Sequence, residues 1–429
     1  MEINTEFRLN IKQTNAIEHI NSGKNIFLTG GTGVGKTAVL KYFIRMNKHI
    51  KNIAITSTTG TSAILLNGST LHSYLGIGLG TGSSGSITTK INKKKYLKER
   101  WKNMDVLIID EVSMLSAELF DKLEEIARSV RKNKLPFGGI QLILSGDFTQ
   151  LKPIDSDKFC FESESWNFII QEIIYLTEII RQNNKLFQEC LNDIRLANIT
   201  PKTQNIINKR VGIELENEFG IIPTELYAKN DIVNSINKTS LKNLAKEGNI
   251  IYEYNLEFEI YKNSENQTSD ISKLREKYLK SVPAMEKLEI CKGCQVMLLY
   301  NLDIENKLIN GSRGIVIDFV DDIPIVKFLN GIERLIDYTI WEIEESDTKI
   351  ASITQIPLKL GYAFSIHKIQ GCSLDFAIMD LSEIFDYGMA YVALSRLRNL
   401  DGLSIISIDW NKIKIHPKAK IFYENLLSK

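Results

Sequence analysis

The sequence predicts an α/β fold in which parallel sheets are covered by helices, and three observations lead to this prediction. Short apolar runs alternate with amphipathic segments in both halves of the chain, as they do when helices join parallel strands. A glycine-rich loop at residues 30–37 joins an apolar run to a helix start. Between residues 294 and 353 hairpin turns follow one another closely, which indicates a small β-barrel inserted in the second α/β unit.

The first half is expected to contain a parallel sheet with one clear covering helix. The strands expected there are short apolar runs at residues 26–29, 53–56, 106–109 and 140–145. Apolar residues recur at spacings of three and four from Leu115 to Val130, which predicts an amphipathic helix between the last two strands. The stretch 76–95 is rich in Gly, Ser and Thr and then in Lys, so we expect a flexible basic excursion outside the sheet.

The second half repeats the α/β pattern around the inserted barrel. Buried strands are expected at residues 226–228, 377–380 and 403–407, with a helix over 231–244. The barrel strands are expected at 296–299, 314–319, 323–329 and 333–338, with turns at Asn310-Gly311 and Asn330-Gly331. The polar stretch 261–287 is expected to be a surface helix or a linker.

Composition excludes some classes of protein. With 429 residues and 43% hydrophobic content, the chain can form two or three domains with cores of their own. The formal net charge is +1, so a nucleic-acid site would have to be a local basic groove. No run approaches the roughly 18 apolar residues of a membrane span, and the first residues lack the basic and apolar regions of a signal peptide. We therefore expect an intracellular protein that is not secreted and has no membrane partner.

The five cysteines contain one regular spacing, Cys291-x-x-Cys294. Zinc binding and redox chemistry are both open for this pair, but no second pair or histidine cluster accompanies it. The apolar residues 296–299 follow directly and predict a strand. A structural role is the interpretation that the sequence favours.

The glycine-rich loop has the complete pattern of a phosphate-binding loop. Residues 30–37 read Gly-Gly-Thr-Gly-Val-Gly-Lys-Thr and match G-x-x-x-x-G-K-[ST] at every fixed position. Glycines let the main chain wrap closely around a phosphate chain, so that backbone N–H groups converge on it. Lys36 is then expected to reach the β- and γ-phosphates of a nucleoside triphosphate, and the Thr37 hydroxyl is expected to bind Mg²⁺.

Partners for this loop are expected at the ends of two other strands. Hydrolysis needs one carboxylate for Mg²⁺ and another to orient or deprotonate water. Asp110 and Glu111 follow the apolar run 106–109, and we assign Asp110 to the metal and Glu111 to the water. Gln150 follows the run 140–145 and could contact the γ-phosphate and sense its loss.

Distinctive motifs follow one another from about Leu9 to Leu403. They are Leu9-Asn10-x-x-Gln13-x-x-Ala16 and the residues 58–63, 70–78, 109–114, 146–153, 176–182, 310–314, 365–371 and 391–396. In this order they resemble the PIF-type helicases of superfamily 1B, which are DNA motors related to the RecD-like and Dda helicases. The resemblance covers nearly the whole chain.

The resemblance implies two RecA-like P-loop domains with parallel sheets. Motor domain 1 is expected at residues 1–175, with a small flexible wedge insertion at about 71–100. Motor domain 2 is expected at 176–293 and 356–429, with an SH3-like barrel inserted at 294–355.

The resemblance also implies roles for individual residues. The nucleotide-binding residues are Gln13 at the adenine and Gly33, Gly35, Lys36, Thr37 and Ala38. The catalytic residues are Lys36, Glu111, Gln150, Arg181 and Arg396, and the Mg²⁺ ligands are Thr37 and Asp110. The DNA-binding residues are Thr59, Gly60, His72, Tyr74, His367 and Lys368, with the lysines of 90–95 as a further basic patch. Because the two arginines are expected in the second motor domain, closure of the domains would complete the site.

The expected activity is that of a monomeric helicase that uses ATP and Mg²⁺, translocates 5′ to 3′ on single-stranded DNA and unwinds forked duplexes. The family connects this activity with DNA repair, recombination and telomere maintenance. Two alternatives stay open, namely a motor subunit of a nuclease complex and an ATP-switched clamp that binds strands without unwinding them. The intact catalytic set favours a motor over a clamp, because a clamp need not keep it.

Overall fold

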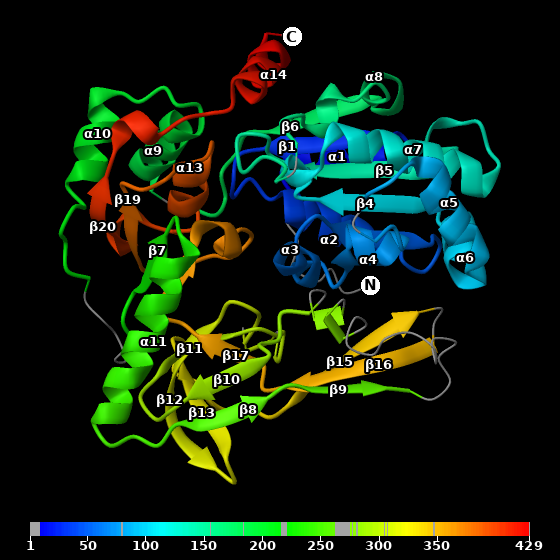
Figure 1. Cartoon of the computed structure of the whole chain (residues 1–429). Coiled ribbons are helices and arrows are strands. Elements are labelled where there is room, and N and C mark those ends of the chain that lie inside the picture. Colours follow the sequence, from blue (N-terminus) through cyan, green and yellow to red (C-terminus); the bar gives the residue numbers. More distant parts are fainter. Residues whose placement is uncertain are drawn as a thin grey trace, which may run out of the picture. The chain divides into compact units, whose positions relative to one another are not determined.

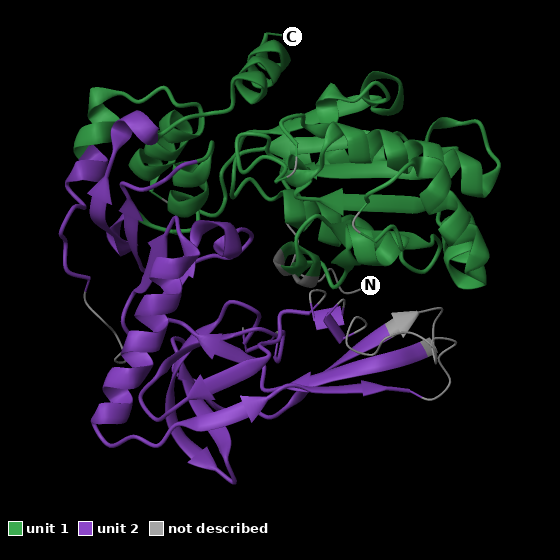
Figure 2. Cartoon of the chain, viewed as in Figure 1, with its two compact units in different colours: residues 1–205, 386–399, 413–429 green, residues 206–385, 400–412 purple. Residues whose placement is uncertain are grey.

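The computed structural model describes residues 9–78, 80–154, 156–182, 184–215, 221–261, 275–276, 278–279, 282–303, 305–306, 308–345 and 348–428. Contacts divide the chain into two compact units (Figure 2). Unit 1 contains Met1–Asn205, Asp386–Asn399 and Ile413–Lys429, and unit 2 contains Ile206–Phe385 and Leu400–Lys412. Each unit has a parallel sheet, which confirms the predicted α/β class.

Unit 1 is built on a six-stranded parallel sheet with the order β3-β2-β4-β5-β1-β6 (Figure 1). Its strands are β1 (Ile26–Gly30), β2 (Ile53–Ser57), β3 (Ser69–Thr70), β4 (Val106–Asp110), β5 (Gln141–Gly146) and β6 (Glu172–Leu176). All residues of β1 and β4 are buried, as expected of apolar runs inside a covered parallel sheet. The four strands predicted from sequence are confirmed as β1, β2, β4 and β5.

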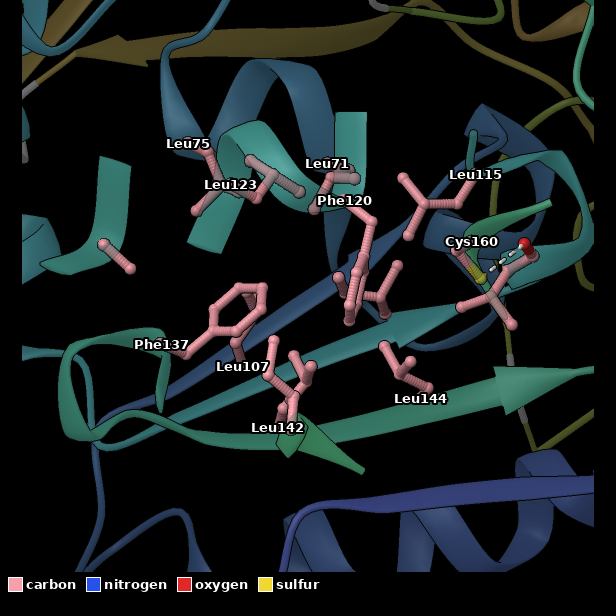
Figure 3. Close-up of a cluster of buried hydrophobic side chains, with 14 of the residues drawn as sticks. Leu71, Leu75, Leu107, Leu115, Phe120, Leu123, Phe137, Leu142, Leu144 and Cys160 are labelled. Carbon is pink, nitrogen blue, oxygen red and sulfur yellow. Dashed lines mark hydrogen bonds between the residues drawn. The ribbon is translucent and has the colours of Figure 1, made fainter. Parts of the chain in front are cut away.

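Unit 1 also contains helices. They are α1 (Ile11–Asn21), α2 (Lys36–Asn47), α3 (Gly60–Leu65), α4 (Leu71–Leu75), α5 (Ser84–Lys93), α6 (Lys95–Asn103), α7 (Ala117–Arg131), α8 (Trp166–Ile169), α9 (Lys185–Arg195), α13 (Met389–Leu394) and α14 (Pro417–Leu427). The predicted amphipathic helix is confirmed as α7, whose Phe120 and Leu123 pack with Leu107 and Leu144 of the sheet in one buried cluster (Figure 3). Helix α10 (Pro201–Asn208) spans the division between the units.

Residues 76–95 lie outside the sheet, as predicted, but the predicted flexible segment contains helix α5 over Ser84–Lys93 and ends where α6 begins. Ser83 caps α5 by accepting a hydrogen bond from the Ser86 N–H. Ile87 and Ile91 lie one turn apart and are buried in the same cluster as Trp101 of α6. Apolar contacts thus order a stretch whose composition alone suggested flexibility.

Unit 2 contains a second parallel sheet with the order β18-β7-β19-β20. Its strands are β7 (Thr224–Tyr227), β18 (Ala363–Ser365), β19 (Ala377–Leu381) and β20 (Leu403–Ile408), and helix α11 (Asn230–Lys246) packs on β18 and β7. The three predicted strands and the predicted helix are confirmed here.

Antiparallel sheets form the rest of unit 2. One has the order β14-β13-β12-β11-β17, with β11 (Gln295–Leu298), β12 (Arg313–Val320), β13 (Ile323–Phe328), β14 (Glu333–Leu335) and β17 (Leu358–Leu360). Two smaller sheets contain β8 (Tyr252–Asn255) with β10 (Lys287–Ile290), and β9 (Glu257–Ile260) with β15 (Thr339–Glu345) and β16 (Thr348–Gln355). The predicted barrel strands are confirmed as β11 to β14, and the stretch 261–287 lies largely outside the described residues.

Cys291 and Cys294 are both buried as free thiols in the core of these antiparallel sheets. Among the described residues, no group of three or more His, Cys, Asp or Glu side chains could hold a metal ion. The burial of Cys291 and Cys294 in this core agrees with the structural role that the sequence favours for them.

No helix in the described ranges has the length and apolar character needed to cross a membrane.

Candidate nucleotide and DNA site

The phosphate-binding loop lies between β1 and α2, and its glycines adopt backbone angles that other residues rarely adopt. Gly30, Gly33 and Gly35 have φ values of 143°, 85° and 85°. A Cβ at Gly30 would lie 2.2 Å from the Leu176 carbonyl oxygen, and one at Gly35 would lie 2.3 Å from Gln13 Nε2. Both the conformation and the close packing of this loop therefore require glycine.

The Lys36 ammonium closes back on the loop. Its Nζ donates to the carbonyl oxygens of Gly30 at 2.7 Å and Gly31 at 3.0 Å. Burial lowers the pKa of Lys36, while the carboxyl groups of Asp147, Glu111 and Asp110 oppose this shift. The ammonium is thus placed among three acidic side chains beside the loop.

Asp110 and Glu111 stand at the end of β4, two strands from β1 in the sheet. Burial and the neighbouring Glu111 raise the pKa of Asp110 to about 7, and the positive charge of Lys36 opposes this rise. A divalent cation beside Asp110 would favour the charged carboxylate, and its role as a Mg²⁺ ligand stays a prediction. Glu111 has a φ of 54°, and its carbonyl oxygen accepts from Thr58 Oγ1 at 2.6 Å. This left-handed conformation at a non-glycine residue is typical of constrained functional sites.

A buried ion pair beside the loop was missed by sequence reasoning. Asp147 follows β5, and both of its oxygens accept from Arg195 of α9, at 2.9 Å from Nε and 3.0 Å from Nη2. Burial alone would raise the pKa of Asp147, but Arg195 outweighs it and holds the pKa below its usual range. Thr149 also donates to Asp147, through its backbone N–H at 3.1 Å and its hydroxyl at 2.8 Å. These bonds fix the loop that carries Gln150.

Arg181 and Arg396 both belong to unit 1, the unit that contains the phosphate loop. Arg396 is 2% exposed, and its Nη2 lies 3.0 Å from Ser395 Oγ and 3.5 Å from Thr32 Oγ1. The backbone N–H of Arg181 donates to the Gly33 carbonyl oxygen at 3.1 Å. Both arginines were predicted to lie in a second unit, away from the loop. The structure instead places them in the same unit as the loop.

The arginines are held beside the loop by the residues around them. Gln182 donates through Nε2 to the carbonyl oxygens of Ser395 at 3.3 Å and Leu397 at 3.0 Å. These bonds join the segment that carries Arg181 to the segment that carries Arg396. Burial, followed by the positive charge of Arg396, lowers the pKa of Arg181 to about 10. Arg181 Nη1 is buried and has no hydrogen-bond partner among the described residues. Two neighbouring cations of which one has an unsatisfied buried donor are suited to an anion such as phosphate.

The remaining predicted nucleotide residues lie around the same loop. Thr37 and Ala38 are in the first turn of α2. Gln13 is buried, its Nε2 donates to the Val34 carbonyl oxygen at 3.1 Å, and its Oε1 accepts from the Asn10 N–H at 3.0 Å. Gln13 therefore connects α1 to the loop, and its contact with an adenine stays a prediction. Gln150 is buried, and its N–H donates to the Asp147 carbonyl oxygen at 3.1 Å.

Four of the predicted DNA-binding residues lie in unit 1, on and before the short helices α3 and α4. Thr59 Oγ1 accepts from the Ser62 N–H at 3.3 Å, and Gly60 begins α3. His72 and Tyr74 are in α4, and burial lowers the pKa of His72. Arg100 of α6 lies 4.8 Å from the ring centre of Tyr74 and donates to its carbonyl oxygen at 2.8 Å. Helix α6 thus holds Tyr74, one of the residues predicted to contact DNA, through Arg100.

The other two predicted DNA-binding residues lie in unit 2, in a 3₁₀ turn over Ile366–Ile369 that follows β18. Lys368 is exposed, and His367 is partly buried. The His367 ring stacks on Phe385 with a centroid distance of 6.0 Å. The basic side chain of Lys368 and the imidazole of His367 are therefore accessible at the end of a parallel strand.

Two family models match this chain. The model of the PIF1-like helicase family matches residues 8–205, and that of the DNA helicase Pif1 2B domain matches residues 274–319. Protein 030L of Invertebrate iridescent virus 6 is 37% identical, covering 100% of this chain and 96% of its own length. The ATP-dependent DNA helicase Pif1 of Bdellovibrio bacteriovorus is 33% identical, covering 98% of this chain and 92% of its own length.

A vertebrate relative is longer. The ATP-dependent DNA helicase PIF1 of Xenopus laevis is 36% identical over 98% of this chain, and the chain spans 65% of that protein. The matching part is therefore about two thirds of the vertebrate protein.

Solved structures match over nearly the whole chain. The Pif1 helicase of Candida albicans has a TM-score of 0.83 and 35% identity, covering 98% of this chain and 100% of the other. The Pif1 helicase of Bacteroides in complex with ADP-AlF3 and single-stranded DNA has a TM-score of 0.72 and 28% identity, covering 99% of this chain and 98% of the other.

Proposed function

Because this chain belongs to the PIF1-like helicase family, we propose that it is an ATP-dependent DNA helicase. The observation that carries the proposal is the set of side chains around the phosphate loop in unit 1. Lys36 opens α2 directly after the loop, and Asp110 and Glu111 stand at the end of β4. Arg396 is buried and Arg181 is partly buried beside the same loop. A phosphoryl transfer site needs these cations and carboxylates together.

Each residue of the set has a role in the proposed hydrolysis. Lys36 leaves the carbonyl oxygens of the loop and pairs with the β- and γ-phosphates of ATP. Thr37 and Asp110 would hold Mg²⁺, which neutralises charge on the phosphates when it is bound. Glu111 accepts a proton from the attacking water or orients it, and Gln150 contacts the γ-phosphate. Arg181 and Arg396 stabilise the charge that develops on the transferred group.

The DNA grip is proposed to be independent of base sequence. The formal net charge of +1 gives no general attraction, so a groove must supply the cations. We assign Thr59, Gly60, His72 and Tyr74 of unit 1, and His367 and Lys368 of unit 2, to DNA binding, with the lysines of 90–95 as a further basic patch of unit 1. Phosphate contacts and ring stacking hold a strand without reading base edges.

Affinity for a single-stranded oligonucleotide is expected to fall with log salt at a slope of about −0.7 per phosphate neutralised. Replacement of both His367 and Lys368 by Ala should weaken binding, make the slope shallower and reduce the stimulation of ATP hydrolysis by DNA. Fluorescence anisotropy across a salt series measures the affinity and the slope, and steady-state hydrolysis with and without DNA measures the stimulation. Lys242→Ala is the matched control, because Lys242 is an exposed lysine of the same unit on α11. Unchanged affinity and full stimulation in the double variant would remove both residues from the site.

The direction of movement is proposed to be 5′ to 3′. Strand displacement is expected on forked duplexes with a single-stranded 5′ tail and not on those with only a 3′ tail, and only when ATP and Mg²⁺ are present. Displacement from the 3′ tail would reverse the proposed direction. ATP-dependent binding without any displacement would support an ATP-switched clamp instead of a motor.

A further inference from the structure

Helix α14 brings a tyrosine into the centre of unit 1. Tyr423 of α14 is 1% exposed, and its neighbour Phe422 packs against the rings of Phe27 and Phe148, with centroid distances of 6.1 and 5.2 Å. Phe27 belongs to β1 and Phe148 to the loop after β5. The helix therefore lies against the two strands that lead into the phosphate loop and the Gln150 loop.

The Tyr423 hydroxyl joins these two strand ends through hydrogen bonds. It lies 2.6 Å from Thr29 Oγ1 and accepts from the Phe148 N–H at 3.1 Å. Thr29 Oγ1 in turn donates to the Gly146 carbonyl oxygen at 2.9 Å, and Thr29 and Gly146 are register partners of β1 and β5.

The direction of these bonds is determined by the groups at both ends. The Phe148 N–H can only donate, and the Gly146 carbonyl oxygen can only accept. Because the Thr29 hydroxyl has a single proton and gives it to Gly146, the Tyr423 hydroxyl must donate to Thr29. The resulting chain runs from Phe148 N–H through Tyr423 and Thr29 to Gly146, and every member of it is satisfied.

Arg195 connects the same tyrosine to the buried ion pair. Its guanidinium lies 4.7 Å from the Tyr423 ring centre while it binds both oxygens of Asp147. Thr29 directly precedes Gly30 of the phosphate loop, and Asp147 fixes the loop of Gln150. One side chain thus contacts the supports of both halves of the nucleotide site.

We propose that Tyr423 is a positioning residue for ATP hydrolysis. Its hydroxyl keeps the start of the phosphate loop and the Gln150 loop at a fixed separation, so that the γ-phosphate bound by one meets the polar side chains of the other. The proposal rests on the proposed ATP hydrolysis, and it assigns Tyr423 no contact with nucleotide. Small errors in such alignment slow turnover much more than they weaken binding.

The test is Tyr423→Phe in the full chain. The ring and its contact with Arg195 remain, and only the hydroxyl is lost. We expect kcat of DNA-stimulated ATP hydrolysis to fall about tenfold, while KM for ATP and DNA affinity change less than twofold. Tyr254→Phe is the matched control, because the Tyr254 hydroxyl also donates one hydrogen bond, to the carbonyl oxygen of Asp322 at 2.5 Å, but lies in unit 2. The control is expected to keep its kcat.

A second variant separates positioning from general destabilisation. Thr29→Val removes the hydroxyl that links Tyr423 to Gly146 in this series of hydrogen bonds. The double variant Thr29→Val/Tyr423→Phe should therefore have a kcat no lower than that of the slower single variant. Additive losses, or a kcat for Tyr423→Phe within twofold of wild type, would overturn the proposal while leaving the helicase assignment intact. If Tyr423→Phe and Tyr254→Phe lowered kcat by the same factor and also lowered the melting temperature by the same amount, the loss would reflect general destabilisation. That result would also overturn the proposal. A wild-type chain without DNA-stimulated ATP hydrolysis would overturn both proposals.

Discussion

Glu111→Gln is expected to bind ATP but to hydrolyse it more slowly by about 10²-fold or more. The substitution keeps the size of the side chain and removes the base. Lys36 and Thr37, which are expected to hold the phosphates and Mg²⁺, are unchanged. Nucleotide binding followed by a fluorescent ATP analogue, and steady-state hydrolysis with saturating DNA, measure the two quantities separately.

Two comparisons sharpen this result. Lys36→Ala should lose both binding and turnover, because it removes the only ammonium assigned to the phosphates. Glu164→Gln makes the same chemical change at an exposed position of unit 1 and should behave as wild type. If Glu111→Gln retained near-normal turnover with DNA present, the water-activating residue would have to be sought elsewhere.

Local patterns in the sequence were enough to predict two of the acidic residues that lie near Lys36 of the glycine-rich loop. The loop pattern of 30–37 and the acidic pair after β4 are each contiguous, and parallel strands place their carboxyl ends at one edge of a sheet. The sequence alone therefore predicts that Asp110 and Glu111 lie beside the loop. The structure adds the pKa of Asp110 and the left-handed backbone of Glu111.

The supports of the site could not be predicted in the same way. Arg195 pairs with Asp147 across 48 positions of sequence, and Tyr423 meets Thr29 across 394. Arg195 ends an amphipathic helix and Tyr423 lies in another, and in a single sequence such residues look like ordinary helix residues. Only the packing of distant segments reveals what they hold.

The helices α5 and α6 were missed for a different reason. Glycine, serine and threonine in 76–89 favour turns and linkers, and this composition outweighed a weaker signal. That signal was present, since Ser83 stands directly before α5 as its cap, and Ile87 and Ile91 repeat at a helical spacing. Burial of these isoleucines against α7 decides the outcome, because tertiary contacts override local propensity.

The placement of the arginines changes how the site is expected to work. Arg396 is buried and Arg181 is partly buried in the same unit as the phosphate loop. Burial, and after it the repulsion by the positive charge of Arg396, lowers the pKa of Arg181 to about 10. An anion between or beside them would relieve this repulsion. Charge that appears on the phosphoryl group during transfer would relieve it further, so their effect should be larger in the transition state than in the bound state.

Arg396→Ala is accordingly expected to lower DNA-stimulated turnover by about 10²-fold or more and to change ATP affinity much less. Arg396→Lys should recover part of the loss, because it restores the charge without the planar fork of donors. Arg45→Ala, at an exposed arginine of α2, is the matched control and should retain its turnover. Steady-state hydrolysis together with nucleotide titrations decides between two roles. Parallel losses of affinity and turnover in Arg396→Ala would mean that Arg396 binds ATP in the ground state, whereas a loss confined to turnover would place its action in the transition state.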